Sequence, residues 1–224
     1  MDTILGFIRG SVEAQQFGWN AGTFFALGAF LVSFLQAYGA WKLLSAILGK
    51  KSATGVSLPM VAYWNAFLWI FLFYGIQSKS LVMVANIALG GPIYVVILFS
   101  LLRYGEVATR SVLTATLPSI LMGTIYALLP DKSVPILVFM LGGILFNLDQ
   151  PRVLWMDRCV GSYAPQFTIS MMVASAFWFF FAWLVAHDVA LMIVNPTSFA
   201  VGAFTLYAYV RAKKYEAKQI ASRP

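Results

Sequence analysis

The sequence predicts an all-α integral membrane protein with seven transmembrane helices, arranged as two parallel three-helix repeats joined by one linker helix. Three observations support this prediction. The 224-residue chain has a mean hydropathy of +0.82 and only 10% charged residues, against about a quarter in soluble domains. Its charges separate seven apolar stretches that are continuous rather than alternating, which favours helices over a β-barrel. A spacing of polar residues also occurs twice along the chain.

The uncharged stretches define the expected helices. They cover residues 14–41, 52–78, 80–102, 111–130, 133–148, 159–186 and 189–210. A bilayer core of about 30 Å needs about 20 helical residues. Six stretches meet this length, and the fifth must place Asp149 or Arg152 near the bilayer edge. Pro59 and Pro165 are expected to open the second and the sixth helix. The expected helices lie near residues 18–46, 57–76, 80–103, 109–129, 133–155, 165–186 and 189–211.

The chain is thereby divided into five segments. The first 17 residues are weakly apolar, carry Asp2, Arg9 and Glu13, and lack the pattern of a signal peptide. They are expected to lie outside or to lead into the first helix along the membrane surface. The segments are an outside N-terminal segment (1–17), the first three-helix repeat (18–103), the linker helix (104–131), the second three-helix repeat (132–211) and a solvated cytoplasmic tail (212–224).

The predicted duplication depends on repeated spacings. Trp69 precedes Asn86 by 17 positions, and Trp178 precedes Asn195 by the same number. Three features of the first copy recur 114 positions later: Leu27-Gly28, Gln36 and Trp41 correspond to Leu141-Gly142, Gln150 and Trp155. The offset falls to 109 in the later helices, so the first copy has five extra residues in a loop. Because three crossings end on the opposite side of the membrane, one extra helix is needed to give both copies the same orientation.

Basic residues are distributed unequally between the two sides of the predicted membrane protein. If the N-terminus is outside, twelve basic residues lie inside and three, Arg9, Lys79 and Lys132, lie outside. This bias predicts an outside N-terminus and a cytoplasmic C-terminus, with the cell membrane as the expected location. The net charge of +7 is then explained by topology and by contact with anionic lipid. A nucleic-acid partner is not expected.

The repeated Trp and Asn residues are the main candidates for a binding site. All four lie about six or seven residues from the outer ends of their helices, so they are expected to form one layer about 10 Å below the outer surface. An amide offers a neutral donor and acceptor, and an indole offers a face for the C–H groups of a sugar ring. The alternative is structural, because Asn often joins membrane helices and Trp often lies in interfacial belts. The candidates are Asn86, Asn195, Trp69 and Trp178.

Further residues are secondary candidates. Asn65 lies one turn before Trp69 on the same helix face, and Ser175 neighbours the corresponding face in the second copy. Both are expected to line the same cavity. Pro92 and Pro196 follow the two candidate asparagines and are expected to let the helices bend.

A second group of residues is a candidate for an inner gate or hinge. Gln36 and Gln150 lie toward the inner ends of the first and fifth helices, and Gln150 is flanked by Asp149, Pro151 and Arg152. The alternative is a pair of polar helix ends in which Asp149 and Arg152 pair at the level of the lipid headgroups. A third interpretation makes Asp149 a proton carrier.

Enzymatic and metal chemistry lack the necessary residues. Cys159 is the only cysteine, which excludes an intramolecular disulfide. His187 is the only histidine and lies beside Asp188 in an expected outer loop, so neither a histidine metal cluster nor a Ser-His triad is expected. No metal and no cofactor are expected, and the protein is not expected to be an enzyme. A retinal pigment is also excluded, because residues 189–210 contain no lysine for the Schiff base.

Several of these motifs resemble those of a known family. They are Ser33-Phe34-Leu35-Gln36, the segment 50–59, Asn65-Ala66-Phe67-Leu68-Trp69 and Tyr74-Gly75. These segments resemble the PQ-loop, the lysine-serine-x-x-glycine-x-serine segment and the Trp and Tyr-Gly signature of the SWEET sugar transporters and the wider PQ-loop (MtN3-like) superfamily. The chain has two extra residues between this Trp and Tyr. The candidate asparagines and tryptophans fall where the family has its pocket residues.

The resemblance implies a seven-helix uniporter that moves a mono- or disaccharide by facilitated, bidirectional diffusion and alternating access. In it the two asparagines bond hydroxyl groups and the two tryptophans enclose the sugar ring. Two alternatives stay open: a PQ-loop-type carrier of an amino acid or another small polar solute, proton-coupled through Asp149, and a non-transporting seven-helix receptor or scaffold. The expected partners are a small solute and the lipid bilayer, and a homo-oligomer is left open.

Overall fold

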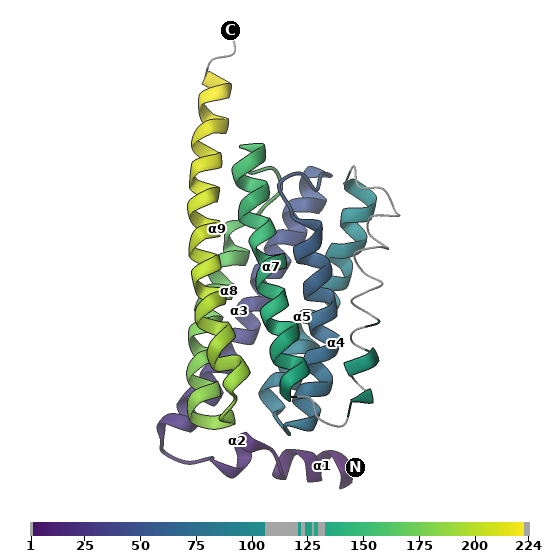
Figure 1. Ribbon diagram of the computed structural model, residues 1–224, viewed down its shortest axis with the longest axis vertical. Coiled ribbons are helices and arrows are strands. Elements are labelled where there is room, and N and C mark those ends of the chain that lie inside the picture. The colour runs from purple at the N-terminus through teal and green to yellow at the C-terminus, as the bar shows by residue number, and fades with distance from the viewer. Residues whose placement is uncertain (1, 106–120, 122–123, 127, 130–132, 222–224) are drawn as a thin grey trace.

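The computed structural model describes residues 2–105, 121, 124–126, 128–129 and 133–221 (Figure 1). The described chain is helical and contains no strand. Six of its helices are long and apolar enough to span a membrane. Most of the predicted helix over 109–129 lies outside the described residues. The spanning helices are α3 (Ala21–Lys50), α4 (Leu58–Gln77), α5 (Leu81–Tyr104), α7 (Ser133–Asp157), α8 (Pro165–Phe181), which continues into the π-helical turn η1 (Ala182–Ala186), and α9 (Val189–Ala221).

The six spanning helices form a closed ring. α5 packs against both α3 and α4, and α9 packs against both α7 and α8, so each is the middle helix of a group of three. The two groups meet where α3 packs on α8 and α4 packs on α7. The order around the ring is therefore α3, α5, α4, α7, α9 and α8. Exchanging the first group with the second leaves this order unchanged, as expected for two copies in the same orientation.

The two ends of the ring are built differently (Figure 1). At one end lie the short helices α1 (Asp2–Arg9) and α2 (Val12–Gln15), together with the α4–α5 and η1–α9 turns. We call this the N-terminal end. At the other end lie the α3–α4 and α7–α8 loops and the last turns of α9, and we call this the C-terminal end. The final turns of α9 project beyond the other helices.

Local sequence signals explain where the helices begin. The side chains of Asn20, Ser57 and Ser80 accept bonds from backbone N–H groups in the first turns of α3, α4 and α5. These bonds satisfy donors that have no partner within the helix. Pro59 and Pro165 lie in the first turns of α4 and α8, where a missing N–H leaves no helical bond unmade. The predicted starts of these two helices are confirmed within one residue.

Two helix ends differ from the prediction. α3 continues to Lys50, four residues beyond its predicted end, and stops where Lys51 adopts a left-handed conformation with φ 49°. α9 continues to Ala221, ten residues beyond its predicted end at residue 211. Packing supports the first of these extra turns, because the Arg211 guanidinium lies 3.4 Å from the centre of the Trp155 ring and Ala212 is buried.

A backbone crossing joins the two groups at the C-terminal end. Gly55 and Gly161 both have positive φ, at 81° and 49°, and each lies against the loop of the other. A Cβ on Gly55 would lie 2.5 Å from the Val160 carbonyl oxygen, and one on Gly161 would lie 2.1 Å from the Thr54 carbonyl oxygen. The Ser162 N–H donates to this Thr54 oxygen at 2.7 Å. Glycine permits both the conformation and the close approach.

Replacing Gly55 with alanine should therefore destabilise the protein. The new Cβ would meet the Val160 carbonyl, and the residue would be held in a left-handed conformation. We expect a loss of about 1–3 kcal/mol, seen as a lower melting temperature in detergent when tryptophan fluorescence is followed. Gly142→Ala in α7 is the matched control, because a Cβ there meets nothing within 4 Å. An equal fall for both variants would contradict the proposed role of the crossing.

Candidate functional site

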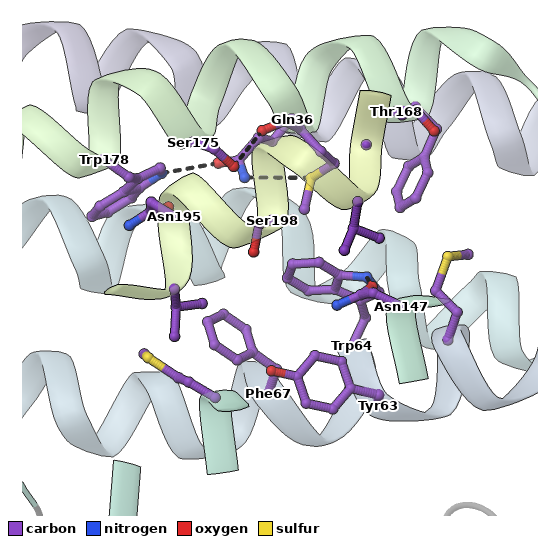
Figure 2. A pocket seen from close by; sticks show the side chains of 18 of the residues that line it. Gln36, Tyr63, Trp64, Phe67, Asn147, Thr168, Ser175, Trp178, Asn195 and Ser198 are labelled. Atoms are coloured by element: carbon purple, nitrogen blue, oxygen red, sulfur yellow. Dashed lines mark hydrogen bonds between the residues drawn. The ribbon is translucent and has the colours of Figure 1, made fainter. Parts of the chain in front are cut away.

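A cavity of about 120 Å³ lies inside the ring, and all six spanning helices line it (Figure 2). Its lining combines uncharged polar side chains with aromatic rings. Among the described residues, no cluster of His, Cys, Asp and Glu could hold a metal ion. The polar residues with amide or hydroxyl side chains are Ser33, Gln36, Asn86, Asn147, Gln150, Thr168, Ser175, Asn195, Ser198 and Thr205. The aromatic residues are Tyr63, Trp64, Phe67, Phe71, Tyr94, Tyr163, Phe167 and Trp178.

Gln36 is the centre of one polar cluster in this cavity. Its Oε1 accepts bonds from Asn86 Nδ2 at 2.7 Å and from Trp178 Nε1 at 3.3 Å. Its Nε2 donates to Met171 Sδ at 3.4 Å, and Asn86 Nδ2 also donates to Ser33 Oγ at 3.0 Å. Asn86 thus directs its N–H donors at the protein, whereas its carbonyl oxygen has no partner among the described residues. That oxygen can accept a bond from a hydroxyl group.

Trp64 and Asn147 form a second indole–amide pair. Trp64 Nε1 donates to Asn147 Oδ1 at 3.0 Å, and Asn147 Nδ2 donates to the Gly143 carbonyl at 2.9 Å. Both indole–amide pairs join the two groups of helices, since Trp178 of α8 bonds Gln36 of α3 and Trp64 of α4 bonds Asn147 of α7. The α3–α8 interface and the α4–α7 interface therefore each contain one bond from an indole to an amide.

The two indoles lie at different depths. α4 and α8 both begin at the C-terminal end, with Pro59 and Pro165 in their first turns. Trp64 follows Pro59 by five residues, and Trp178 follows Pro165 by 13. This difference of eight residues corresponds to about 12 Å along a helix axis, and Figure 2 shows the two rings well apart. The cavity is therefore bounded by one indole nearer each end.

Asn195, Ser175 and Ser198 line the cavity from α8 and α9 (Figure 2). Asn195 Nδ2 donates to the Leu191 carbonyl at 2.7 Å, a bond within its own helix. The carbonyl oxygen of Asn195 has no partner in the part of the chain that the structure describes. Asn86 and Asn195 therefore each present a free acceptor to the cavity, from opposite groups of the ring.

Trp69 lies outside the cavity, contrary to the prediction. Its side chain is 56% exposed. Trp69 lies two residues before Phe71, and two residues turn a side chain by about 200° around a helix. Phe71 occupies the inward position instead, and its ring meets Trp178 edge to face with centres 5.8 Å apart.

Two other predicted positions are also corrected. Gln36 does not lie at the inner end of its helix, because α3 runs from 21 to 50 and places it at the middle. It lines the cavity, and its function in a gate stays a prediction. Asn65 is buried but does not line the cavity: its Nδ2 donates to the Val61 carbonyl at 3.0 Å and to the Tyr94 carbonyl at 3.1 Å. Asn65 thus joins α4 to α5, as in the structural alternative.

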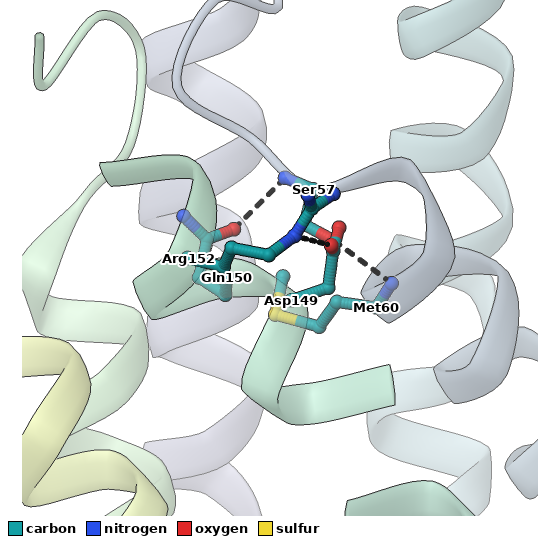
Figure 3. Close-up of polar contacts among 5 residues, drawn as sticks. All are labelled: Ser57, Met60, Asp149, Gln150 and Arg152. Carbon is teal, nitrogen blue, oxygen red and sulfur yellow. Dashed lines mark hydrogen bonds and ion pairs between the residues drawn. The ribbon is translucent and has the colours of Figure 1, made fainter. Parts of the chain in front are cut away.

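Gln150 and its neighbours tie the two groups together at the C-terminal end (Figure 3). Gln150 Oε1 accepts from the Ser57 N–H at 2.9 Å, and its Nε2 donates to the Gly55 carbonyl at 2.8 Å. Ser57 Oγ donates to Asp149 Oδ2 at 2.7 Å. The other oxygen of Asp149 pairs with Arg152 Nε at 2.8 Å. Asp149 is therefore engaged both by the start of α4 and by a cation on its own helix.

A second connection between the groups lies at the N-terminal end. The Tyr74 hydroxyl of α4 donates to the carboxylate of Asp188, which precedes α9. The other oxygen of Asp188 accepts from the Leu191 N–H at 3.0 Å, so the carboxylate also caps α9. Bonds between the groups thus lie on both sides of the cavity.

Three prolines lie inside spanning helices: Pro92 in α5, Pro151 in α7 and Pro196 in α9. Each lacks an N–H and so leaves the carbonyl four residues earlier without its helical partner. Pro92 follows Asn86 by six residues, and Pro196 directly follows Asn195. Their function as hinges stays a prediction.

Sequence reasoning missed Ser33, Asn147 and Trp64. Ser33 and Asn147 are separated by 114 positions, which is the offset between the first helices of the two predicted copies. Two polar residues at matched positions in apolar helices were therefore a usable signal. Trp64 has no tryptophan at the matched position, and no sequence pattern marked it.

No protein-family model matches the chain, and no curated protein sequence matches it. A solved structure is similar: the 3.7 Å structure of a eukaryotic SWEET transporter. The TM-score is 0.53 at 14% sequence identity, over 85% of this chain and 99% of that chain. At this identity the similarity concerns the fold. The chain is thus a multi-pass helical membrane protein with a SWEET-like fold.

Proposed function

We propose that this protein is a membrane carrier that moves an uncharged sugar in both directions, by facilitated diffusion through alternating access. The observation that carries the proposal is the neutral cavity. None of the described residues that line it is charged, whereas amides, hydroxyls and indoles line it from both groups of helices. The SWEET-like fold supports the proposal, because the similar structure is that of a transporter.

The neutral lining favours a sugar over an amino acid. A zwitterion would bring two charges into a low-dielectric cavity without counter-charges, which is strongly unfavourable. A sugar brings hydroxyl groups that can donate to the free carbonyl oxygens of Asn86 and Asn195. Its C–H faces can pack on the indoles of Trp64 and Trp178. Ser175 and Ser198 add hydroxyls to the same lining.

The small size of the cavity argues against a disaccharide. At about 120 Å³ it is no larger than a protein cavity of about 150 Å³ that holds benzene, a molecule of six heavy atoms. A monosaccharide has about twice as many heavy atoms, so the cavity must widen even for a single sugar ring, and a disaccharide would require far more. We therefore assign a monosaccharide as the preferred substrate within the mono- or disaccharide class.

Alternating access requires that the cavity open to one side while the other stays closed. We assign Gln150, Asp149 and Ser57 to the inner gate, and Tyr74 with Asp188 to the outer gate. Each set of bonds joins one group of helices to the other, so either set can break while the other holds. Asp149 acts in this scheme through its bonds to Ser57 and Arg152, and transport is not proton-coupled.

The distribution of basic residues supports the orientation of the carrier. In the described chain, ten basic residues lie toward the C-terminal end and two lie at the N-terminal end. This asymmetry supports a cytoplasmic C-terminal end and an outside N-terminal end. The ten are Lys42, Lys50, Lys51, Arg103, Arg152, Arg158, Arg211, Lys213, Lys214 and Lys218, and the two are Arg9 and Lys79.

Replacing either cavity asparagine should impair transport. We expect Asn86→Ala and Asn195→Ala each to lower the uptake of a labelled hexose by about tenfold, since each loses an acceptor for a buried hydroxyl. Uptake is measured in proteoliposomes without an ion gradient, and an imposed pH gradient should not change it. Unaltered hexose uptake in both variants would contradict the assigned site.

The two repeated tryptophans should differ in function. Trp178→Ala removes an indole that is 5% exposed and bonded to Gln36, so we expect hexose uptake to fall by at least about tenfold. Trp69→Ala removes an indole on the outer face of the ring and should leave uptake within about twofold of wild type. Equal losses of uptake in the two variants would contradict the assignment of Trp178 to the cavity and of Trp69 to the outer face.

Weakening the outer gate should expose the cavity to the outside. In a Cys159→Ser background, Ser198→Cys places a single thiol in the cavity. We expect Tyr74→Phe, which loses the bond to Asp188, to speed labelling of this thiol by an impermeant reagent added outside. Ser57→Ala is the matched control, because it weakens the opposite gate and should not speed labelling from outside. Faster labelling in the control alone would reverse the gate assignment.

A further inference from the structure

The N-terminal segment runs across the N-terminal end of the ring rather than parallel to the spanning helices (Figure 1). It includes α1 (Asp2–Arg9), α2 (Val12–Gln15) and the link to α3, and none of it is needed to build the ring or the cavity. Its bonds and its exposed side chains nevertheless point to a defined function.

Glu13 in α2 fastens this segment to the first group of helices. Its carboxylate accepts from Ser80 Oγ at 2.5 Å, from the Leu81 N–H at 3.1 Å and from the Val82 N–H at 3.2 Å. These donors form the N-terminus of α5, where unpaired N–H groups and the helix dipole favour a negative charge. The Val12 N–H also donates to the Lys79 carbonyl at 3.1 Å. The segment is therefore held to the α4–α5 turn.

Gln16 fastens the same segment to the second group. Its Nε2 donates to the Val185 carbonyl of η1 at 3.1 Å. Its own backbone carbonyl accepts from Asn20 Nδ2 at 3.0 Å and from Thr23 Oγ1 at 3.2 Å, which fixes it at the start of α3. Glu13 and Gln16 are only three residues apart, so a short stretch of chain joins both groups.

The segment spans the same two parts of the ring as the outer gate. Tyr74 lies six residues before Ser80, near the end of α4, and Asp188 lies three residues after Val185. Separation of Tyr74 from Asp188 must therefore also strain the connection made through Glu13 and Gln16. The segment is placed so as to oppose opening of this end.

α1 presents apolar side chains that the protein leaves uncovered. Ile4, Leu5 and Ile8 are 68%, 43% and 41% exposed and lie on one side of the helix. The exposed Phe17 and Trp19 follow at the same end of the ring. The spanning helices put this end at the surface of the bilayer, where an amphipathic helix lies in the plane with its apolar side in lipid and where Trp is enriched.

We propose that residues 2–20 form a lipid-anchored strap. The apolar side of α1 binds the lipid–water interface of the outer leaflet, and Glu13 and Gln16 connect this anchor to the two groups of helices that separate when the outer gate opens. The strap stabilises the closed outer gate. Its effect on gating rests on the alternating access proposed above, whereas its contact with lipid does not.

The lipid contact is tested with a spin label on each side of α1. Ile4→Cys and Gly6→Cys, each in the Cys159→Ser background, are labelled and reconstituted into phosphatidylcholine vesicles. Paramagnetic resonance should show the label at position 4 accessible to oxygen and shielded from an aqueous nickel complex, and the label at position 6 accessible to nickel. Equal nickel access at both positions would overturn the assignment of α1 to the interface.

The effect on the gate is tested by the rate at which the Ser198→Cys thiol is labelled from outside. Glu13→Ala and Gln16→Ala should each raise this rate by about fivefold or more. This factor is the change in the opening equilibrium expected when about one net hydrogen bond is lost. Glu13→Gln, which keeps one acceptor oxygen, should be intermediate. Asp157→Asn, an exposed carboxylate at the opposite end, is the matched control and should leave the rate unchanged.

A further pair of variants tests whether the lipid contact of α1 affects the outer gate. Ile4→Asp changes no bond of Glu13 or Gln16, yet it should raise the labelling rate because α1 leaves the lipid, whereas Gly6→Asp on the opposite side should not. Wild-type rates in Glu13→Ala, Gln16→Ala and Ile4→Asp would overturn the strap. Since none of these readouts uses a sugar, a failure to transport sugar would count against the proposed substrate and leave the strap standing.

Discussion

The structure depends on one constraint: a polar side chain within the bilayer must find its partner inside the protein. The closed ring of helices meets this constraint by turning its amides inward, where Gln36 joins Asn86 to Trp178 and Asn147 holds Trp64. The N–H donors are directed at the protein, and carbonyl oxygens are left over. The arrangement that stabilises the ring thus leaves acceptors for the hydroxyl groups of the neutral ligand that we propose.

The contacts between the two groups of helices follow from the same constraint. Within each group, the helices are held along their length by packing around α5 or α9. Between the groups, α3 packs closely on α8. Polar bonds join the groups at the two indole–amide pairs, the Gln150 cluster, the Thr54–Ser162 crossing and the Tyr74–Asp188 bond. Because the bonds near the two ends are separate, one set can break while the other stays intact, as the proposed rocking of the two groups requires. Polar bonds along the whole length of the interface between the groups would have to break together.

Much of the fold could be predicted from the sequence, and the candidate site could be predicted only in part. Asn86, Asn195, Trp178 and Ser175 do line the cavity, because depth in a membrane helix can be counted from its ends. Trp69 and Gln36 were misplaced for two different reasons. A repeated spacing gives depth but not rotation about the helix axis, and Trp69 faces outward while Phe71 faces the cavity. The end of α3 lacks a strong stop signal before Lys51, so Gln36 was assigned to a helix end.

The sequence by itself determined that the chain crosses a membrane as apolar helices, where most of these begin and which side is basic. These properties follow from local composition, capping and helix length. Only the tertiary structure decided that α3 meets α8 while α4 meets α7, that Trp64 pairs with Asn147, and that Glu13 reaches the start of α5. The reason is physical: such partners are distant in the chain, and inside a bilayer any apolar face can meet lipid as readily as another helix.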